Sequence, residues 1–301
     1  MQHSKALIPL LFLWWTAALL SGMGCSIERE IGGFPDLDAG VAFDSQVNPD
    51  GQVDEAIDLD GHWLLFTEDR RCIVPGLGET VENIVWTDYL VRFSREDEQS
   101  AILSVNLQIC RQVLSPLPFN FITVVPEAVV NNLPELDFNG FLVGDRVGAT
   151  FVTEPAVHLW GYQDGDVSAP LPVDGEDERV LDQDQDGLPG LSMPVLTEDG
   201  NEICQVRVVQ RNTLQLEGNV ASADRIKGRL SIRPEEVILA TSTALCAGGD
   251  VSKSTASDRF ELLKLDDDVT DCEMLRAQID MIRQRLSAPE STPDGAQHCP
   301  E

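Results

Sequence analysis

The sequence predicts a mainly β protein, an antiparallel barrel or sandwich with one C-terminal amphipathic helix. Short apolar runs recur about every 8 to 12 residues from Gly61 onward, and Gly, Pro, Asn and Asp separate them, which is typical of such folds. No alternation of strands with helices is visible, so we do not expect a parallel sheet. One stretch near the C-terminus has apolar residues at helical spacing.

The strand candidates lie on both sides of an acidic segment around residues 161–190. On the first side, partial alternation in 83–93 and 101–109 places apolar side chains on one face. The full set of candidates is 63–67, 83–93, 101–109, 121–125, 141–143, 148–153, 157–160, 191–196, 204–210, 213–220, 226–232 and 237–241.

A hairpin is expected near the middle of the second group. Val206 and Val208 alternate before residues 211–212, and Leu214 and Leu216 alternate after them. The polar pair Arg-Asn between the two runs then forms the turn.

The predicted helix begins near residue 270. Residues Thr270-Asp271-Cys272-Glu273 have the form of a capping box, in which a hydroxyl and a carboxylate satisfy free backbone amides. Ala288-Pro289 ends the helix after about four turns. Its apolar face, which we expect to pack on the sheet, consists of Leu275, Ile279, Ile282 and Leu286.

The N-terminus has the order of a secretory signal peptide. Lys5 precedes an apolar run over 6–20, and small residues at 21–24 lead to Cys25. This run is shorter than the roughly 20 residues of a membrane span. The cysteine after small residues resembles the lipobox of bacterial lipoproteins, although Gly22 stands where leucine is usual. The resemblance implies a lipid on Cys25 and, with Ser26 next, sorting to the outer membrane; ordinary signal-peptidase cleavage is the alternative.

These features divide the chain into four parts. Residues 1–24 form the signal peptide, and residues 25–59 form the lipidated cysteine with an acidic, flexible tether whose composition cannot bury enough apolar surface to order it. Residues 60–286 form the β-domain with its C-terminal helix, and residues 287–301 form a tail.

The cysteines fit an exported protein. The chain has seven, and a lipid on Cys25 leaves an even set of six for disulfides in an oxidising compartment. Pairing nearest neighbours along the chain gives Cys72–Cys110, Cys204–Cys246 and Cys272–Cys299.

The chain is strongly acidic. Its formal net charge is −30, which argues against nucleic acid as a partner because the two would repel each other. The charge suits a cation-rich environment, and it equally suits a solvated surface that keeps an exported protein soluble.

The sharpest chemical motif is Asp182-Gln183-Asp184-Gln185-Asp186-Gly187. Carboxylates at positions 1, 3 and 5 with glycine at 6 can wrap a calcium ion, and the carbonyl of Leu188 at position 7 can add a ligand. The motif resembles the calcium loops of EF-hands, dockerins and thrombospondin type 3 repeats. Position 12 is Met193, so the last ligand must come from elsewhere, and Asp174, Asp177 and Glu178 are the candidates. The alternative is an acidic turn without metal.

Gly61-His62-Trp63 at the start of the first strand is similar to the Gly-x-Trp signature of lipocalins. That resemblance implies a tryptophan closing the base of an eight-stranded barrel that holds an apolar ligand.

Catalytic patterns are nearly absent. Beyond the leader the histidines are His62, His158 and His298, and none has a zinc-like spacing to another His or Cys. The nucleophile-elbow and dinucleotide-binding patterns are also missing. We interpret His158 as a half-buried strand residue, and we do not expect an enzyme.

The sequence therefore predicts a lipid-anchored cell-envelope protein with a calcium-stabilised β-domain and a binding or structural role, whose protein or small-molecule partner is unknown. The alternatives are a lipocalin-like carrier of a small apolar ligand and a metal-assisted hydrolase. A wide apolar cavity near Trp63 and Trp86 would favour the carrier. Converging acids away from Asp182 would favour the hydrolase, and a filled interior would favour the first reading.

Overall fold

The computed structural model describes residues 57–74, 79–95, 97, 100–117, 120–246, 251–293 and 298–299, which belong to one compact unit, Val47–Glu301. The predicted signal peptide, Cys25 and the tether up to residue 56 lie outside the described residues.

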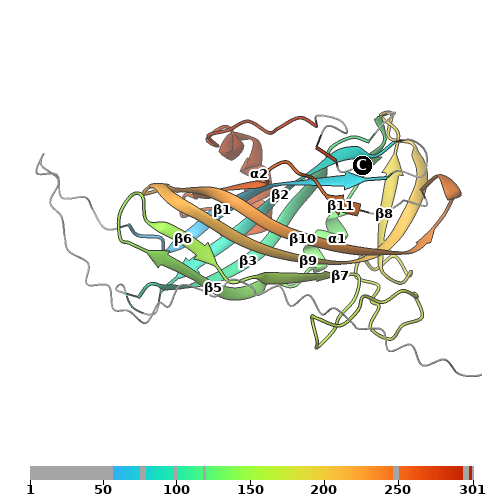
Figure 1. The fold of residues 1–301 in the computed structure, drawn as a ribbon, viewed down its shortest axis with the longest axis horizontal. Helices are drawn as coiled ribbons and strands as arrows, with labels where there is room; N and C mark the ends of the chain where they lie inside the picture. Colours follow the sequence, from blue (N-terminus) through green and yellow to red (C-terminus); the bar gives the residue numbers. More distant parts are fainter. Residues whose placement is uncertain are drawn as a thin grey trace, which may run out of the picture. The chain divides into compact units, whose positions relative to one another are not determined.

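The described residues form twelve strands, two α-helices and a short 3-10 helix (Figure 1). In chain order they are β1 (Gly61–Ile73), β2 (Val81–Ser94), β3 (Ile102–Leu114), β4 (Ile122–Thr123), α1 (Glu127–Asn132), β5 (Leu136–Val143), β6 (Thr150–Thr153), β7 (Ala156–Trp160), β8 (Leu191–Leu196), β9 (Glu202–Ser222), β10 (Arg225–Thr241), η2 (Ala244–Cys246), β11 (Val251–Lys253), β12 (Arg259–Lys264) and α2 (Cys272–Arg283).

Eight of the strands close into a ring in which every neighbouring pair is antiparallel. The order around the ring is β1, β2, β3, β5, β6, β9, β10 and β12, so each strand pairs with the next member along the chain. The last member returns to the first, and this pairing places Trp63 opposite Lys264. The prediction of a mainly β, antiparallel fold is confirmed.

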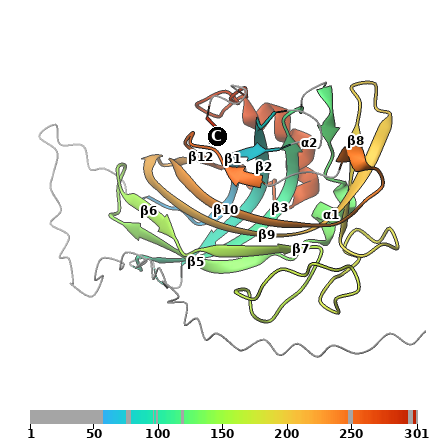
Figure 2. The same cartoon turned by 45° about the vertical axis from the view of Figure 1, so that its right-hand side comes forward.

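Four further strands extend the sheet and are not members of the ring. Strands β7 and β8 pair with β9, β4 pairs with β8, and β11 pairs with β1. The long strands β9 and β10 run past the ring toward β8, as Figures 1 and 2 show.

The interior of the ring is packed with aromatic side chains where β1 begins. The ring of Trp63 meets that of Phe93 at 5.8 Å between centroids, and Phe93 meets Phe151 at 5.7 Å, both edge-on. The indole nitrogen of Trp63 donates to the carbonyl of Leu59 at 2.8 Å, and the ammonium of Lys264 lies 5.8 Å from the indole centroid. Trp86, by contrast, has its indole nitrogen against Glu68 on the outside, so the two tryptophans line no common cavity.

Helix α2 covers the outer face of the sheet over β2 and β3 (Figure 2). Its buried residues Leu275, Ile279 and Ile282 pack on Leu64 and Leu90, which confirms the predicted apolar face. Each such burial contributes roughly 1.5–3 kcal/mol.

The ends of α2 differ from the prediction. Asp271 is the N-cap, since its side chain accepts from the amide of Met274 at 2.8 Å, while the hydroxyl of Thr270 contacts the Met274 sulfur. The helix ends at Arg283, before the predicted stop. The Arg283 guanidinium donates to both oxygens of the fully buried Asp88 on β2, at 2.9 Å each.

The predicted hairpin at 211–212 is wrong. Strand β9 runs without a break from Glu202 to Ser222, and the turn comes after Ser222. The pair Arg211-Asn212 reads as a turn because both residues are polar, yet Arg211 bonds Glu235 on β10 and Asn212 points into the interior. Strands β11 and β12 and helix α1 were not predicted.

The six cysteines of the described structure form three disulfides, Cys72–Cys299, Cys110–Cys272 and Cys204–Cys246. The predicted Cys204–Cys246 bond is confirmed. The predicted bonds Cys72–Cys110 and Cys272–Cys299 are wrong. Helix α2 lies over β3 and brings Cys272 to Cys110, with 5.0 Å between their Cα atoms, while the tail returns to the end of β1.

Contacts with the β-domain extend beyond its predicted limits at both ends. Ile57 and Leu59, assigned to the tether, are buried in the ring, and the Ile57 amide donates to the carbonyl of Asp145 at 2.9 Å. In the tail, the backbone amides of Ser287 and Ser291 bond carboxylates on the sheet. Among the described residues, no helix combines the length and the apolar character needed to cross a membrane.

Candidate functional site

The interior of the ring changes from apolar to polar along β1. Successive side chains of a strand alternate between its faces, so Trp63 is followed on the inner face by Thr67, Asp69 and Arg71. Strand β2 contributes Thr87 to the same end. A buried polar group is costly unless it is hydrogen-bonded, so polar residues at core positions need a reason.

Strands β7 and β9 face this polar end with two cross-strand pairs of polar side chains. His158 lies opposite Asn212, and Trp160 lies opposite Gln210. His158 and Trp160 are each 1% exposed, and Asn212 is 6% exposed. Across the interior, the ring of Tyr89 on β2 lies 6.3 Å from the imidazole of His158. These strands thus bring polar residues to one place. We call the cluster the polar end, and it consists of Thr67, Asp69, Arg71, Thr87, Tyr89, His158, Trp160 and Asn212.

Three of these buried side chains carry polar atoms without a hydrogen-bond partner among the described residues. These atoms are both ring nitrogens of His158, the indole nitrogen of Trp160 and the Oδ1 of Asn212. An unpaired buried polar atom costs on the order of 1–3 kcal/mol. Such atoms are rare in folded proteins, and a ligand or an ordered water usually explains them.

Burial fixes the protonation states at the polar end. Desolvation lowers the pKa of His158 to about 4, so its imidazole is neutral near pH 7. Desolvation also raises the pKa of Tyr89 to about 12, and the phenol keeps its proton. Burial alone would raise the pKa of Asp69, but Arg71 and Lys253 outweigh it and lower that pKa. Asp69 therefore remains a carboxylate with its charge compensated.

The polar end adjoins a groove on the outside of the ring. The groove has about 550 Å³ and lies where β10 separates from β12 after Arg229; its lining includes Lys253 and Asp258. Lys253 pairs with both Asp258 and, at 2.8 Å, Asp69. Ile232 lines the groove and also a small cavity inside the ring at the polar end. The volume of this cavity that the centre of a water molecule can occupy is about 10 Å³, which is room for about one water.

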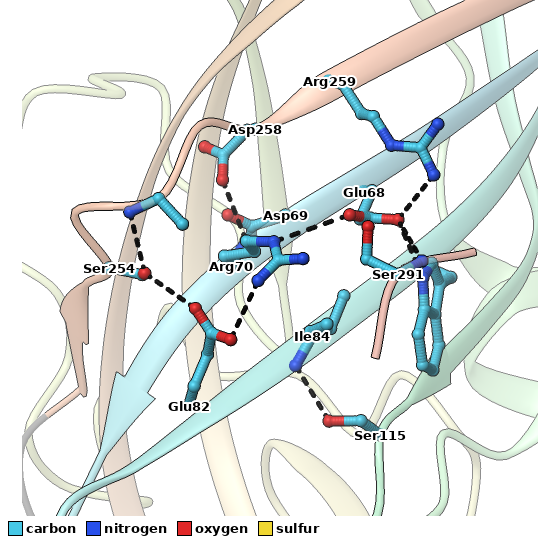
Figure 3. Close-up of polar contacts among 12 residues, drawn as sticks. Glu68, Asp69, Arg70, Glu82, Ile84, Ser115, Ser254, Asp258, Arg259 and Ser291 are labelled. Carbon is cyan, nitrogen blue, oxygen red and sulfur yellow. Dashed lines mark hydrogen bonds and ion pairs between the residues drawn. The ribbon is translucent and has the colours of Figure 1, made fainter. Parts of the chain in front are cut away.

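A second ionic cluster lies on the outer face of β1 and β2 (Figure 3). Arg70 contacts Glu82 at 2.9 Å and Glu68 at 3.5 Å. Burial would raise the pKa of Glu68, but hydrogen bonds from Arg259 at 2.8 Å and from the amide of Ser291 at 3.0 Å lower it. Both carboxylates are committed to these partners, and the cluster fastens the C-terminal segment to the sheet.

The three aspartates of the predicted calcium loop lie together in the segment between β7 and β8. One carboxylate oxygen of each of Asp182, Asp184 and Asp186 lies within 4.8 Å of the others. Asp182 accepts from the amides of Asp186 at 3.0 Å and Gly187 at 2.9 Å, and Gly187 has φ +86°. Leu188 follows in the same turn, and its amide donates to Asp186 at 2.8 Å.

The Asp184 carboxylate is held at one oxygen only. Its Oδ2 accepts from the amide of Ser192 at 2.8 Å, while its buried Oδ1 has no partner within the described residues. Burial and the like charges of Asp186 and Asp182 raise its pKa. An arrangement of three carboxylates in one turn suits a hard divalent cation.

One of the expected additional calcium ligands is engaged by a cation: Asp177 accepts from the Arg179 guanidinium at 3.0 and 2.8 Å. Asp174 accepts one hydrogen bond, from the amide of Glu176 at 2.9 Å, which leaves its carboxylate further lone pairs.

The histidines do not come together. His62 lies on β1 and His298 in the tail, whereas His158 is inside the ring. His158 is a strand residue as predicted, but it is fully buried rather than half-buried.

Sequence reasoning missed the polar end as a unit. The signal in the sequence is that polar residues stand an even number of positions from the apolar core residues of the same strand, so they point to the same face. Thr67 and Asp69 stand in this relation to Trp63. No protein-family model matches this chain, and no curated protein or solved structure matches it either.

Proposed function

We propose that this chain is an exported, lipid-anchored binding protein that takes up a small molecule at the polar end of its β-domain. One observation carries the proposal: buried, unpaired polar atoms of His158, Trp160 and Asn212 converge inside the ring. The space between them holds about one water in this structure, so a small molecule would enter from the adjoining groove by displacing the wall at Ile232, which lines both. A purely structural core would gain stability from apolar side chains at these positions.

A lipocalin-like barrel is the architecture that we propose for the ring. The support is the up-and-down order of its eight strands, the Gly61-His62-Trp63 signature on the first of them and the helix packed outside. A carrier of an apolar ligand has less support, because Trp63, Phe93 and Phe151 fill the apolar end.

A metal-assisted hydrolase also has less support. Glu68 and Glu82 converge on Arg70 on the outer face, Asp69 lies on the inner face, and each of the three is paired with an arginine or a lysine. A general acid or base must instead be free to exchange a proton with a substrate.

We infer two further properties from the sequence motifs. Cys25 carries the lipid that anchors the protein to the outer membrane. Asp182, Asp184 and Asp186 bind calcium, which offsets the repulsion among three carboxylates in one turn.

The binding function is tested by identifying what the exported protein carries. We expect protein purified under native conditions and then denatured to release a small molecule in near-stoichiometric amount, detected by mass spectrometry. The double variant His158→Phe/Asn212→Leu should release none of it. Ser104→Ala, an exposed position on β3, is the matched control. Equal release from wild type and the double variant, or no release from either, would contradict the proposal.

A further inference from the structure

Strand β10 has an edge that no other described strand covers beyond its first residues. It pairs with β12 as far as Arg229, and one more bond joins the amide of Leu230 to the carbonyl of Asp258 at 3.4 Å. Strand β11, which precedes β12 in the chain, pairs with β1 instead. From Ser231 onward, the only backbone partner of β10 among the described residues is β9, so the opposite edge of β10 is unpaired there.

A proline faces this unpaired edge. The backbone groups of successive strand residues point alternately to the two sides of the strand. The amide of Leu230 points away from β9, and the register of β10 to β9 is unbroken from Ile226 to Ile238. The nitrogen of Pro234, four residues after Leu230, therefore points to the unpaired edge. Proline has no N–H, so this position cannot donate to a neighbouring strand.

Pro234 is also the midpoint of the unpaired run. The run begins after Leu230, which is bonded to Asp258, and its regular register ends at the shift after Ile238. Two copies of one edge that pair about a two-fold axis run antiparallel, and the residue on the axis faces itself. In a pairing that spans 230–238 this residue is Pro234. Both N–H groups that the two copies would exchange at the axis are missing.

The charges beside Pro234 favour a second copy as the partner of this edge. In the same pairing, Arg233 of one copy lies opposite Glu235 of the other, and the two-fold axis repeats this contact. The Arg233 side chain is 79% exposed, so it is free to reach across. Opposite charges in a cross-strand pair are stabilising. The missing N–H groups therefore oppose a pairing that the neighbouring side chains support.

We propose that Pro234 keeps this protein from pairing with a second copy of itself through β10. Natural proteins commonly protect the edges of their sheets with proline. Such a pairing would also cover the groove beside β12, because Leu230, Ser231 and Ile232 line it. The proposal does not depend on a ligand, so it stands apart from the proposed function.

Replacing the proline tests the proposal. Pro234→Thr restores the N–H and introduces a residue that suits a strand. Pro194→Thr on β8 is the matched control, because the edge at Pro194 is already covered: its carbonyl accepts from the amide of Val124 at 3.0 Å. All full-length chains also carry Cys25→Ala, so that a lipid cannot cause association. Sedimentation velocity at about 0.15 M salt, which screens the repulsion between acidic chains, measures the mass.

We expect the mass of Pro234→Thr to rise toward twice that of the monomer with increasing concentration. The chain with Pro234 and the Pro194→Thr control should remain monomeric. Adding Arg233→Glu to Pro234→Thr puts like charges opposite each other and should restore the monomer. Melting curves show that each variant is folded, and Pro234→Ala, which restores the same N–H, replaces Pro234→Thr if threonine prevents folding.

A folded Pro234→Thr that stays monomeric at every concentration would overturn the inference. Equal association of Pro194→Thr would do the same, because the effect would then not belong to the edge of β10. So would a dimer of the chain with Pro234 that Arg233→Glu dissociates, since the edge would then pair in spite of the proline.

Discussion

His158 is 1% exposed and has no hydrogen-bond partner among the described residues, although a phenylalanine would be easier to bury there. Asn212, which faces it across β7 and β9, is 6% exposed, and its Oδ1 also lacks a partner among the described residues. Residues of this kind lower the stability of a fold and are typical of sites that need polar atoms for binding.

The burial of His158 makes folding stability depend on pH. Its pKa is about 4 in the folded protein and about 6.5 when unfolded, so the unfolded state binds more protons between these values. We expect the unfolding free energy to fall by about 3 kcal/mol from this residue alone as the pH drops from 6.5 to 4. Urea unfolding across that range measures it. His158→Phe should remove this part of the slope, and an unchanged slope would contradict the neutral, buried state.

At the residue scale, the sequence located His158 in a strand but not at a site. Its neighbours Val157 and Leu159 are as apolar as a core strand requires, so a single polar residue among them gives no sign of the polar residues that it faces. Those residues lie on other strands, and only the pairing of the sheet brings them together.

Helix α2 is fixed to β2 by one buried ion pair as well as by apolar packing. Arg283 satisfies both oxygens of Asp88, which is fully buried. Removing one partner of such a pair leaves an uncompensated charge and typically costs about 3–5 kcal/mol. We expect Arg283→Met to destabilise the protein by this amount in chemical unfolding. Adding Asp88→Asn should restore most of the loss, and a double variant as unstable as the single one would show that the charge is not the cause.

The loop that holds Asp182, Asp184 and Asp186 should make the stability of the protein depend on metal. With calcium at a hundredfold excess over its dissociation constant, binding to the folded state alone adds about 2.7 kcal/mol. We expect a chelator to lower the melting temperature of wild type and to have no effect on Asp184→Ala. Asp199→Ala, in a different acidic turn, should behave as wild type. Identical melting curves of wild type in calcium and in chelator would show that the loop is an acidic turn that binds no calcium.

At the scale of elements, the sequence was most reliable where periodicity is long. The four-residue spacing of Leu275 and Ile279 identified the buried face of α2. The prediction from periodicity failed in β9, because the inward Asn212 and the ion-paired Arg211 interrupt the alternation of apolar residues in the middle of one strand. Polarity at core positions and polarity at turns look alike in a single sequence.

Anchorage concerns the whole molecule. We expect wild-type protein to partition into the detergent phase and to carry diacylglycerol on Cys25, as mass spectrometry of the N-terminal peptide can show. Cys25→Ala should release the protein to the aqueous phase with an unchanged melting curve, since the described core begins at Ile57. Ser26→Ala should remain anchored. An unmodified Cys25 in exported wild-type protein would contradict the lipoprotein assignment.

The global arrangement was the least predictable level. Pairing of β1 with β12 joins residues about 200 positions apart in the chain, and two of the disulfides span 227 and 162 positions. No local pattern encodes such contacts, so nearest-neighbour reasoning succeeded only for the disulfide whose separation is 42.

Closure of the ring by its last strand has a consequence for biogenesis. A chain that crosses a membrane from its N-terminus delivers β1 first, and β1 lacks its partner β12 until nearly the whole protein has arrived. Until then the edge of β1 is open to pairing with other chains, and Cys72 has no access to Cys299. If the chain is exported as we propose, its folding would depend on holding factors and on thiol oxidation that waits for completion. Truncation before β12 would leave a thiol-bearing, aggregation-prone fragment for quality-control proteases to remove.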